Sequence, residues 1–180
     1  YAALNPGENL KLYEYEPEEL KQNEVRIKVH SCGICHSDIS AIDNSWGKSK
    51  YPMIAGHEII GEVIETAPNI SMHKVGDSVG LGWHSGYCNQ CDYCHAGDHN
   101  FCNNTKKTVF SQFGGFAEEV VAEQASVIPI PLKLNLENAG PLLCGGITVF
   151  TPIVEFGINA NHKVGIIGIG GLGHLAINFY

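Results

Sequence analysis

Short apolar runs broken by glycine and proline dominate the first 131 residues and predict β-strands. Residues 25–29 alternate apolar and polar side chains, which is typical of a strand with one buried face. The other expected strands cover residues 58–64, 75–81, 116–121 and 126–130. Many short strands separated by turn residues are typical of a compact barrel or sandwich, so we expect a mainly β domain here.

A helical pattern replaces the strands beyond residue 140. Apolar residues recur at helical spacing between 145 and 158, and Pro152 predicts that this helix is kinked or begins at the proline. The apolar run 163–169 predicts a fully buried strand of the parallel-sheet kind, and a last helical stretch follows at 175–180. We therefore expect the start of an α/β domain after the β domain.

Composition indicates a folded protein that does not bind nucleic acid. Of the 180 residues, 44% are hydrophobic and 17% are charged, which excludes a disordered acidic chain. The net charge of -8 provides no basic surface for DNA or RNA. No apolar run is long enough to span a bilayer, and the first 30 residues lack the apolar core of a signal peptide. We expect a cytoplasmic protein without a membrane partner.

Four of the seven cysteines lie close together, at Cys88, Cys91, Cys94 and Cys102. Four thiolates satisfy tetrahedral zinc, and gaps of two residues let successive sulfurs reach one ion. An odd number of cysteines cannot all form disulfides, and clustered cysteines in a reducing compartment are more often metal ligands. We expect a structural zinc loop at residues 83–103, whose closed shell leaves no position for a substrate.

Other assignments stay open for this loop. An iron–sulfur cluster also uses repeated two-residue gaps between cysteines, and free or disulfide-bonded cysteines are a further alternative. His95 and His99 lie in the same loop and could replace a sulfur, although four sulfurs already complete the shell.

A second, open metal site is expected around Cys32, Cys35 and His57. Catalytic zinc needs three protein ligands and a free fourth position, and two cysteines with one histidine form a known set. Such a set leaves the ion able to polarise a carbonyl or to lower the pKa of a bound alcohol. Spacing alone does not choose between Cys32 and Cys35, and it does not find a third ligand. The alternatives are a thioredoxin-like redox pair of these two cysteines and an ordinary surface pair of His57 and Glu58.

Residues 168–173 match the pattern G-x-G-x-x-G. After an apolar strand and before a helix, such glycines allow a tight turn whose backbone amides meet a pyrophosphate. A glycine-rich turn without a ligand is the alternative. The residue that would distinguish NAD from NADP is expected about 20 positions later, beyond this chain.

Six segments, in their order along the chain, closely resemble the zinc-containing medium-chain alcohol dehydrogenases. They are CGICHSD, GHEIIGEV, GDSVGLGW, the four-cysteine loop, LLCGGIT and VGIIGIGGLG. Within that family the chain most resembles the cinnamyl alcohol dehydrogenases and the bacterial aldehyde reductases. Six such segments in the family's order, over almost the whole chain, are a far more specific signal than any single segment.

The resemblance implies which residues form the metal site. It implies the catalytic zinc ligands Cys35, His57 and Cys144, with Cys32 as a neighbouring residue that does not bind the metal. Glu58 matches a carboxylate that can approach the metal during ligand exchange. Asp38 matches the acid that orients the histidine ring.

The resemblance also implies contacts for the substrate and the cofactor. Ser37 matches the hydroxyl that starts a proton relay, and His36 matches a residue near the cofactor pyrophosphate. Trp46 and Trp83 resemble walls of the substrate cleft, with ordinary aromatic core as the alternative. The expected cofactor-binding residues are Thr148, Gly168, Gly170, Gly171, Leu172 and Gly173.

We expect a GroES-like β-barrel catalytic domain at residues 1–144 and the N-terminal part of a Rossmann dinucleotide-binding domain at residues 145–180. The expected enzyme transfers a hydride between NADP(H) and a primary alcohol or aldehyde, with two zinc ions per subunit and NAD as the alternative cofactor. A Rossmann sheet needs about six strands, and this chain supplies one. We therefore expect it to be the truncated start of a longer homodimeric protein, and the chain alone could be inactive. The alternatives are a non-catalytic zinc-stabilised binding module and a redox or iron–sulfur protein.

Overall fold

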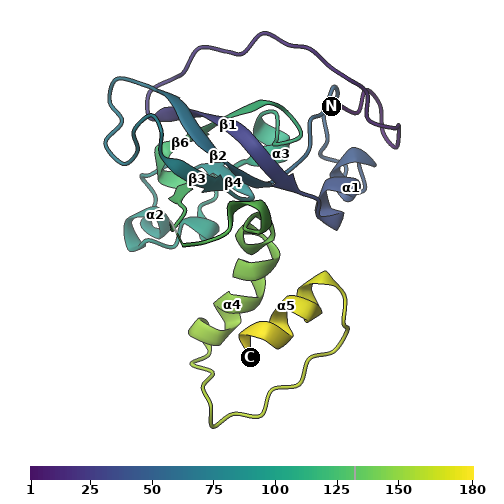
Figure 1. The fold of residues 1–180 in the computed structure, drawn as a ribbon, viewed down its shortest axis with the longest axis vertical. Coiled ribbons are helices and arrows are strands. Elements are labelled where there is room, and N and C mark those ends of the chain that lie inside the picture. Colours follow the sequence, from purple (N-terminus) through teal and green to yellow (C-terminus); the bar gives the residue numbers. More distant parts are fainter. Residues whose placement is uncertain (132) are drawn as a thin grey trace.

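Five antiparallel strands form the main sheet of this computed structural model, which describes residues 1–131 and 133–180 (Figure 1). In sheet order they are β6 (Glu119–Glu123), β1 (Glu24–Gly33), β2 (Glu58–Thr66), β3 (Ser78–Leu81) and β7 (Val127–Pro129). Each strand expected in the first 131 residues is confirmed, although its ends differ from the predicted ones.

The sheet curls because a very short connection joins its two edge strands. β6 ends at Glu123 and β7 begins at Val127, with only the 3₁₀ turn η2 (Gln124–Ser126) between them. Five flat strands at about 4.8 Å spacing would place the edges about 19 Å apart. Four residue steps span at most about 14 Å. The edges must therefore approach each other, which produces the expected barrel-like curvature.

The core fills the inside of this curl. Its fully buried members come from every strand of the main sheet: Val25, Ile27, Ile59, Val63, Val79, Leu81, Val120, Ala122 and Val127. A second apolar cluster contains Ala41, Met53, Ala55 and Val109, with Trp83, Phe110 and Phe116 packed against it. The second cluster lies next to the residues that the sequence assigned to the open metal site.

A two-stranded ribbon carries the four-cysteine loop. It consists of β4 (His84–Gly86) and β5 (Lys106–Lys107), with α2 (Asp92–Ala96) and the 3₁₀ turn η1 (His99–Phe101) in the loop between them. The carboxylate of Glu123 ties this ribbon to the main sheet, since it lies 2.6 Å from Lys106 Nζ and accepts the Tyr87 backbone N–H at 3.2 Å. The remaining elements of this region are α1 (His36–Ile42) and α3 (Thr108–Ser111).

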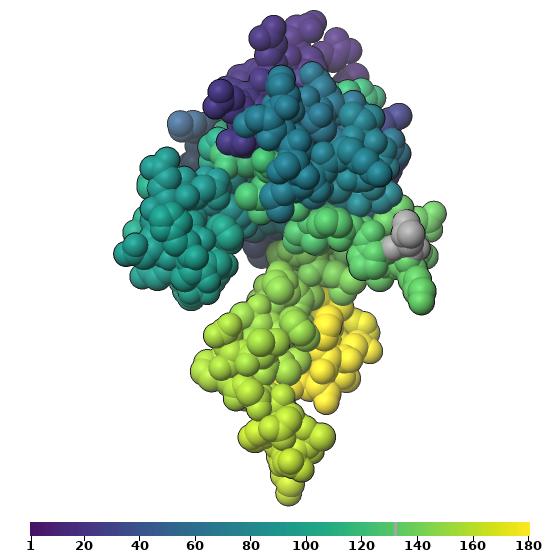
Figure 2. Space-filling view, turned by 90° about the vertical axis from the view of Figure 1, so that its left-hand side faces the viewer, coloured from purple at the N-terminus to yellow at the C-terminus, as the bar shows by residue number. Residues whose placement is uncertain are grey.

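The last part of the chain forms a helical lobe beside the sheet (Figures 1 and 2). After the 3₁₀ turns η3 (Leu136–Asn138) and η4 (Gly140–Leu143) it contains α4 (Gly145–Glu155) and α5 (Gly171–Phe179), which pack against each other. The alternative that the first helix begins at Pro152 is wrong, because α4 runs from Gly145 through that proline. None of the helices in the described ranges is long and apolar enough to cross a membrane.

The strand expected at residues 163–169 is wrong. Those residues adopt no regular secondary structure, and the side chains of Ile167 and Ile169 are exposed. A strand is held by hydrogen bonds to a neighbouring strand, and within the described ranges no strand lies alongside this segment. The helix expected after it is confirmed as α5, which starts earlier than predicted.

The core assignment predicts a large stability difference between two isoleucines. Replacing Ile27, which is 0% exposed, by alanine should lower the free energy of unfolding by about 2–5 kcal/mol because it leaves a cavity. Replacing Ile128, which is 49% exposed in β7, by alanine should lower the free energy of unfolding by no more than about 0.5 kcal/mol. Urea unfolding of both variants measures the two losses. Equal losses would contradict the proposed position of the core.

Candidate functional site

Donor atoms from four residues converge at the end of the β domain. One ligand atom each from Cys35, His57, Glu58 and Cys144 lies within 4.8 Å of all the others. Cys35 precedes α1, His57 precedes β2, and Cys144 precedes α4. Segments up to 109 residues apart thus supply a single group, which is buried or half-buried throughout.

The geometry of this group fits a tetrahedral metal ion. The sulfurs of Cys35 and Cys144 are 3.9 Å apart, and His57 Nε2 lies 3.3 Å from Cys144 Sγ. Zinc bonds of about 2.3 Å to sulfur and about 2.0 Å to nitrogen imply separations of about 3.8 and 3.5 Å. Burial and the neighbouring Cys35 raise the pKa of Cys144 to about 12, so two thiolates here need a cation. The donor set therefore suits zinc.

The buried carboxylate of Asp38 fixes the two ligand segments relative to each other. Its Oδ1 accepts the Gly56 backbone N–H at 2.8 Å and lies 2.9 Å from His57 Nδ1. Its Oδ2 accepts the backbone N–H of Cys35 at 3.0 Å. With the proton on Nδ1, the lone pair of Nε2 faces Cys144, which is the orientation that a metal ligand needs.

Cys32 lies outside this group. Burial raises the pKa of its thiol to about 12, which keeps it protonated at neutral pH. Its sulfur packs against Gly56 and Gly115, where an added Cβ at either glycine would come within 2.9 Å of it. The sulfur close to Cys35 is that of Cys144, and all seven cysteines are free of disulfides. The structure thus does not support a Cys32–Cys35 redox pair.

Glu58 belongs to the donor group, and two further predicted residues, His36 and Ser37, directly follow Cys35 in the chain. Glu58 is 5% exposed, and burial raises the pKa of its carboxyl group above the ordinary value. Ser37 and His36 form the first turn of α1, where Ser37 is half-buried and His36 is exposed. The start of α1 therefore places a residue with an imidazole and one with a hydroxyl directly after Cys35 in the chain.

The sulfurs of the four-cysteine loop form a second group. The sulfurs of Cys88, Cys91, Cys94 and Cys102 lie within 4.8 Å of one another, and three of the pairs are 3.5 to 3.9 Å apart. Backbone N–H groups of Gln90 and Cys91 lower the pKa of Cys88 to about 6, which favours a thiolate. His95 is exposed, and the ring of His99 packs on Tyr87 with 4.7 Å between centroids. Neither histidine belongs to the sulfur group.

An aromatic cluster covers His57. The ring of Trp83 meets the His57 ring edge-on at 4.8 Å, and Trp46 and Phe110 each lie about 6 Å from Trp83. Trp46 is 45% exposed, so the cluster is open on one side. Both tryptophans follow from the family resemblance, whereas Phe110 carries no sequence signal beyond being an apolar residue after the cysteine loop.

The glycine-rich turn lies at the start of α5, beside the start of α4. Gly168 has a φ of 88°, and a Cβ on Gly173 would overlap the carbonyl oxygen of Gly168. A Cβ on Gly145 would come within 3.5 Å of Leu172, so the turn packs next to Cys144. Thr148 Oγ1 donates to the Cys144 carbonyl at 2.7 Å. Gly170 and Gly171 have open space around them.

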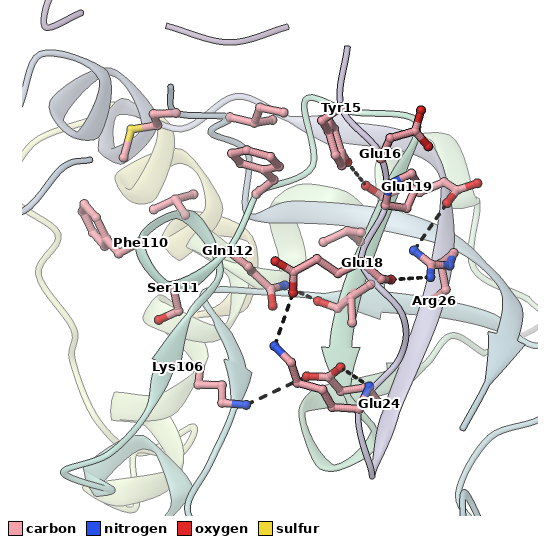
Figure 3. Close-up of a pocket in the computed structure, with 18 of the residues that line it drawn as sticks. Tyr15, Glu16, Glu18, Glu24, Arg26, Lys106, Phe110, Ser111, Gln112 and Glu119 are labelled. Carbon is pink, nitrogen blue, oxygen red and sulfur yellow. Dashed lines mark hydrogen bonds and ion pairs between the residues drawn. The ribbon is translucent and has the colours of Figure 1, made fainter. Parts of the chain in front are cut away.

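A cavity of about 580 Å³ lies elsewhere, and no member of either donor group lines it. Ion pairs join some of its charged residues, with Arg26 contacting Glu119 and Lys106 contacting Glu24 (Figure 3). The convergent chemistry of the molecule is therefore at the two donor groups.

Comparison with known proteins places the chain among enzymes. A model of the alcohol dehydrogenase GroES-like domain matches residues 21–132. The aldehyde reductase AdhA of Synechocystis is 50% identical over 179 residues, which are 99% of this chain and 53% of that protein. The structure of the cinnamyl alcohol dehydrogenase SbCAD4 from Sorghum bicolor matches with a TM-score of 0.92 and 36% identity, over 99% of this chain and 53% of that one. CAD from Helicobacter pylori, complexed with NADP(H), matches with a TM-score of 0.93 and 32% identity, over 99% and 54%. The chain spans about half the length of these relatives.

The hydrogen bonds of Asp38 predict an effect on metal binding. Asp38→Asn should weaken zinc binding at the Cys35, His57 and Cys144 group by about 10–100-fold, because the amide cannot accept all the hydrogen bonds of the carboxylate. Competition with a chelating dye measures this affinity, and the four-cysteine group provides an internal reference. Asp43→Asn is the matched control, since Asp43 is an exposed residue at the end of α1. Equal affinities for the two variants would contradict the role of Asp38.

Proposed function

This chain belongs to the zinc-containing medium-chain alcohol dehydrogenases, and from that membership we propose that its protein transfers a hydride between NADP(H) and a primary alcohol or aldehyde. One observation carries the proposal: two sulfurs and an imidazole from distant segments converge with tetrahedral spacing. Three protein ligands leave a fourth position for a substrate oxygen, as catalytic zinc requires.

Cys35, His57 and Cys144 would hold the catalytic zinc. Zinc in such a set polarises a carbonyl, and bound NADPH supplies the hydride. Asp38 keeps the Nε2 lone pair of His57 directed at the metal position. Glu58, buried beside the ligands, is the carboxylate that can approach the metal during ligand exchange.

The first turn of α1 would carry the proton. Ser37 donates a proton to the substrate oxygen as the carbonyl is reduced, and the exposed imidazole of His36 replaces that proton from solvent. Trp46, Trp83 and Phe110 form an apolar wall next to His57 that excludes water and suits an apolar or aromatic aldehyde.

The helical lobe would contribute the cofactor site. We assign residues 1–144 to the catalytic domain and residues 145–180 to the dinucleotide-binding domain. The proposed cofactor contacts are Thr148, Gly168, Gly170, Gly171, Leu172 and Gly173. The positions of Thr148, bonded to the Cys144 carbonyl, and of Leu172, next to Gly145, support this assignment, because the nicotinamide must reach the metal site. The similarity to a structure complexed with NADP(H) favours NADP over NAD.

We further propose two zinc ions per subunit, a cytoplasmic location and a homodimer. The second zinc rests on the four-sulfur group, whose closed shell suits a structural role. The cytoplasmic location rests on the expected reduced cysteines, and the homodimer rests on the family resemblance alone.

Replacing Cys144 tests the proposed reaction. Cys144→Ser should reduce NADPH-dependent aldehyde reduction by at least about 100-fold, because it removes one of three zinc ligands. Zinc content should fall from two ions per chain to one, with the four-cysteine loop still loaded.

Cys32→Ser is the matched control for this test. Cys32 is half-buried nearby but lies outside the donor group, so this variant should keep both ions and most of the activity. Near-normal aldehyde reduction by Cys144→Ser, or loss of the catalytic ion from Cys32→Ser, would show that the ligand assignment is wrong.

A further inference from the structure

The carboxylate of Glu58 lies over a glycine of the neighbouring strand. Gly33 is the last residue of β1 and pairs with Glu58, the first residue of β2. Residues directly opposite each other in an antiparallel pair place their side chains close together on one face of the sheet. The side chain of Glu58 therefore lies directly beside the position that a side chain of residue 33 would occupy.

A side chain at position 33 would compete with Glu58 for the same space. A Cβ built on Gly33 would overlap Oε2 of Glu58, and it would lie 3.0 Å from the Cβ and 3.1 Å from the Cδ of that residue. The φ angle of Gly33 lies outside the left-handed region, so the backbone itself would accept alanine. Glycine is thus required at position 33 because a side chain has no space there, and not because of the backbone conformation.

The backbone of Glu58 cannot move away to make room. Its carbonyl oxygen would be 2.7 Å from a Cβ placed on Gly140, so η4 packs directly against it. The preceding residue, His57, is 0% exposed and is bonded to Asp38. A side chain at position 33 could be accommodated only if the Glu58 side chain moved.

We propose that Gly33 is a positioning residue, whose missing side chain leaves the space in which the Glu58 carboxylate lies beside Cys35, His57 and Cys144. This inference deepens the proposed function and rests on it for the consequence for activity. The steric relation between Gly33 and Glu58 does not depend on the proposed function.

A double-mutant cycle tests the pair. It uses the intact protein, Gly33→Ala, Glu58→Ala and the double variant, with Gly165→Ala as the matched control because a Cβ there meets nothing within 4 Å. Gly33→Ala and Glu58→Ala should each lower kcat/KM by about tenfold, and the double variant should be no worse than Glu58→Ala. Zinc transfer from Cys35, His57 and Cys144 to a chelating dye should be measured as well. The effects of the two substitutions on its rate should not add in the double variant.

Thermal unfolding of the same proteins provides a readout that does not require activity. Gly33→Ala should lower Tm clearly more when Glu58 is present than when alanine occupies position 58, because alanine removes the carboxylate and keeps only the Cβ contact at 3.0 Å. An equal loss of Tm in both backgrounds, or multiplied losses of kcat/KM, would overturn the proposal. If the parent protein neither binds zinc at Cys35, His57 and Cys144 nor reduces aldehydes, the proposed function fails, while the Tm cycle still decides whether Gly33 positions Glu58.

Discussion

The buried Asp38 carboxylate is the interaction on which the metal site depends. Its two oxygens engage the His57 ring and the backbone N–H groups of Gly56 and Cys35, which belong to segments that are distant in sequence. A carboxylate that is 0% exposed is costly to bury unless all its lone pairs are engaged. The arrangement that satisfies the hydrogen bonds of Asp38 also brings the sulfur of Cys35 and the imidazole of His57 close together. The third ligand, Cys144, is then brought to them by η4, which packs against β1, β2 and β3.

The β domain supports this site by fixing the edge at which its segments meet. The end of β1 and the beginning of β2 are paired, so the residues just outside them, Cys35 and His57, must lie close together. Glycines at positions 33 and 140 allow side chains and backbone to approach at this edge. The four-cysteine loop is held separately, by the Glu123 contacts of the β4–β5 ribbon. The four-cysteine loop and the open site are thus two separate groups of donor atoms with no residue in common.

Local patterns in the sequence predicted the local structure well. The strands of the main sheet follow from alternating or apolar runs, and the sulfur group of residues 88–102 follows from its spacing. The open site could not be found this way, because Cys35 and Cys144 are 109 residues apart and only the fold brings them together. The family resemblance supplied what spacing lacked. Phe110 carries no distinctive signal, and the apolar run at 163–169 predicts a strand for which the described part of the chain offers no partner.

The central claim is that Cys35, His57 and Cys144 share one zinc ion that keeps a free coordination position. Anomalous scattering at the zinc edge from crystals of the protein tests it most directly, because it locates each ion without reference to activity. The account predicts two peaks per chain, one among the four sulfurs of residues 88–102 and one bonded to Cys35 Sγ, His57 Nε2 and Cys144 Sγ with a non-protein fourth ligand. A single peak in the four-cysteine loop, or an ion bound by Cys32 in place of Cys35, would contradict it.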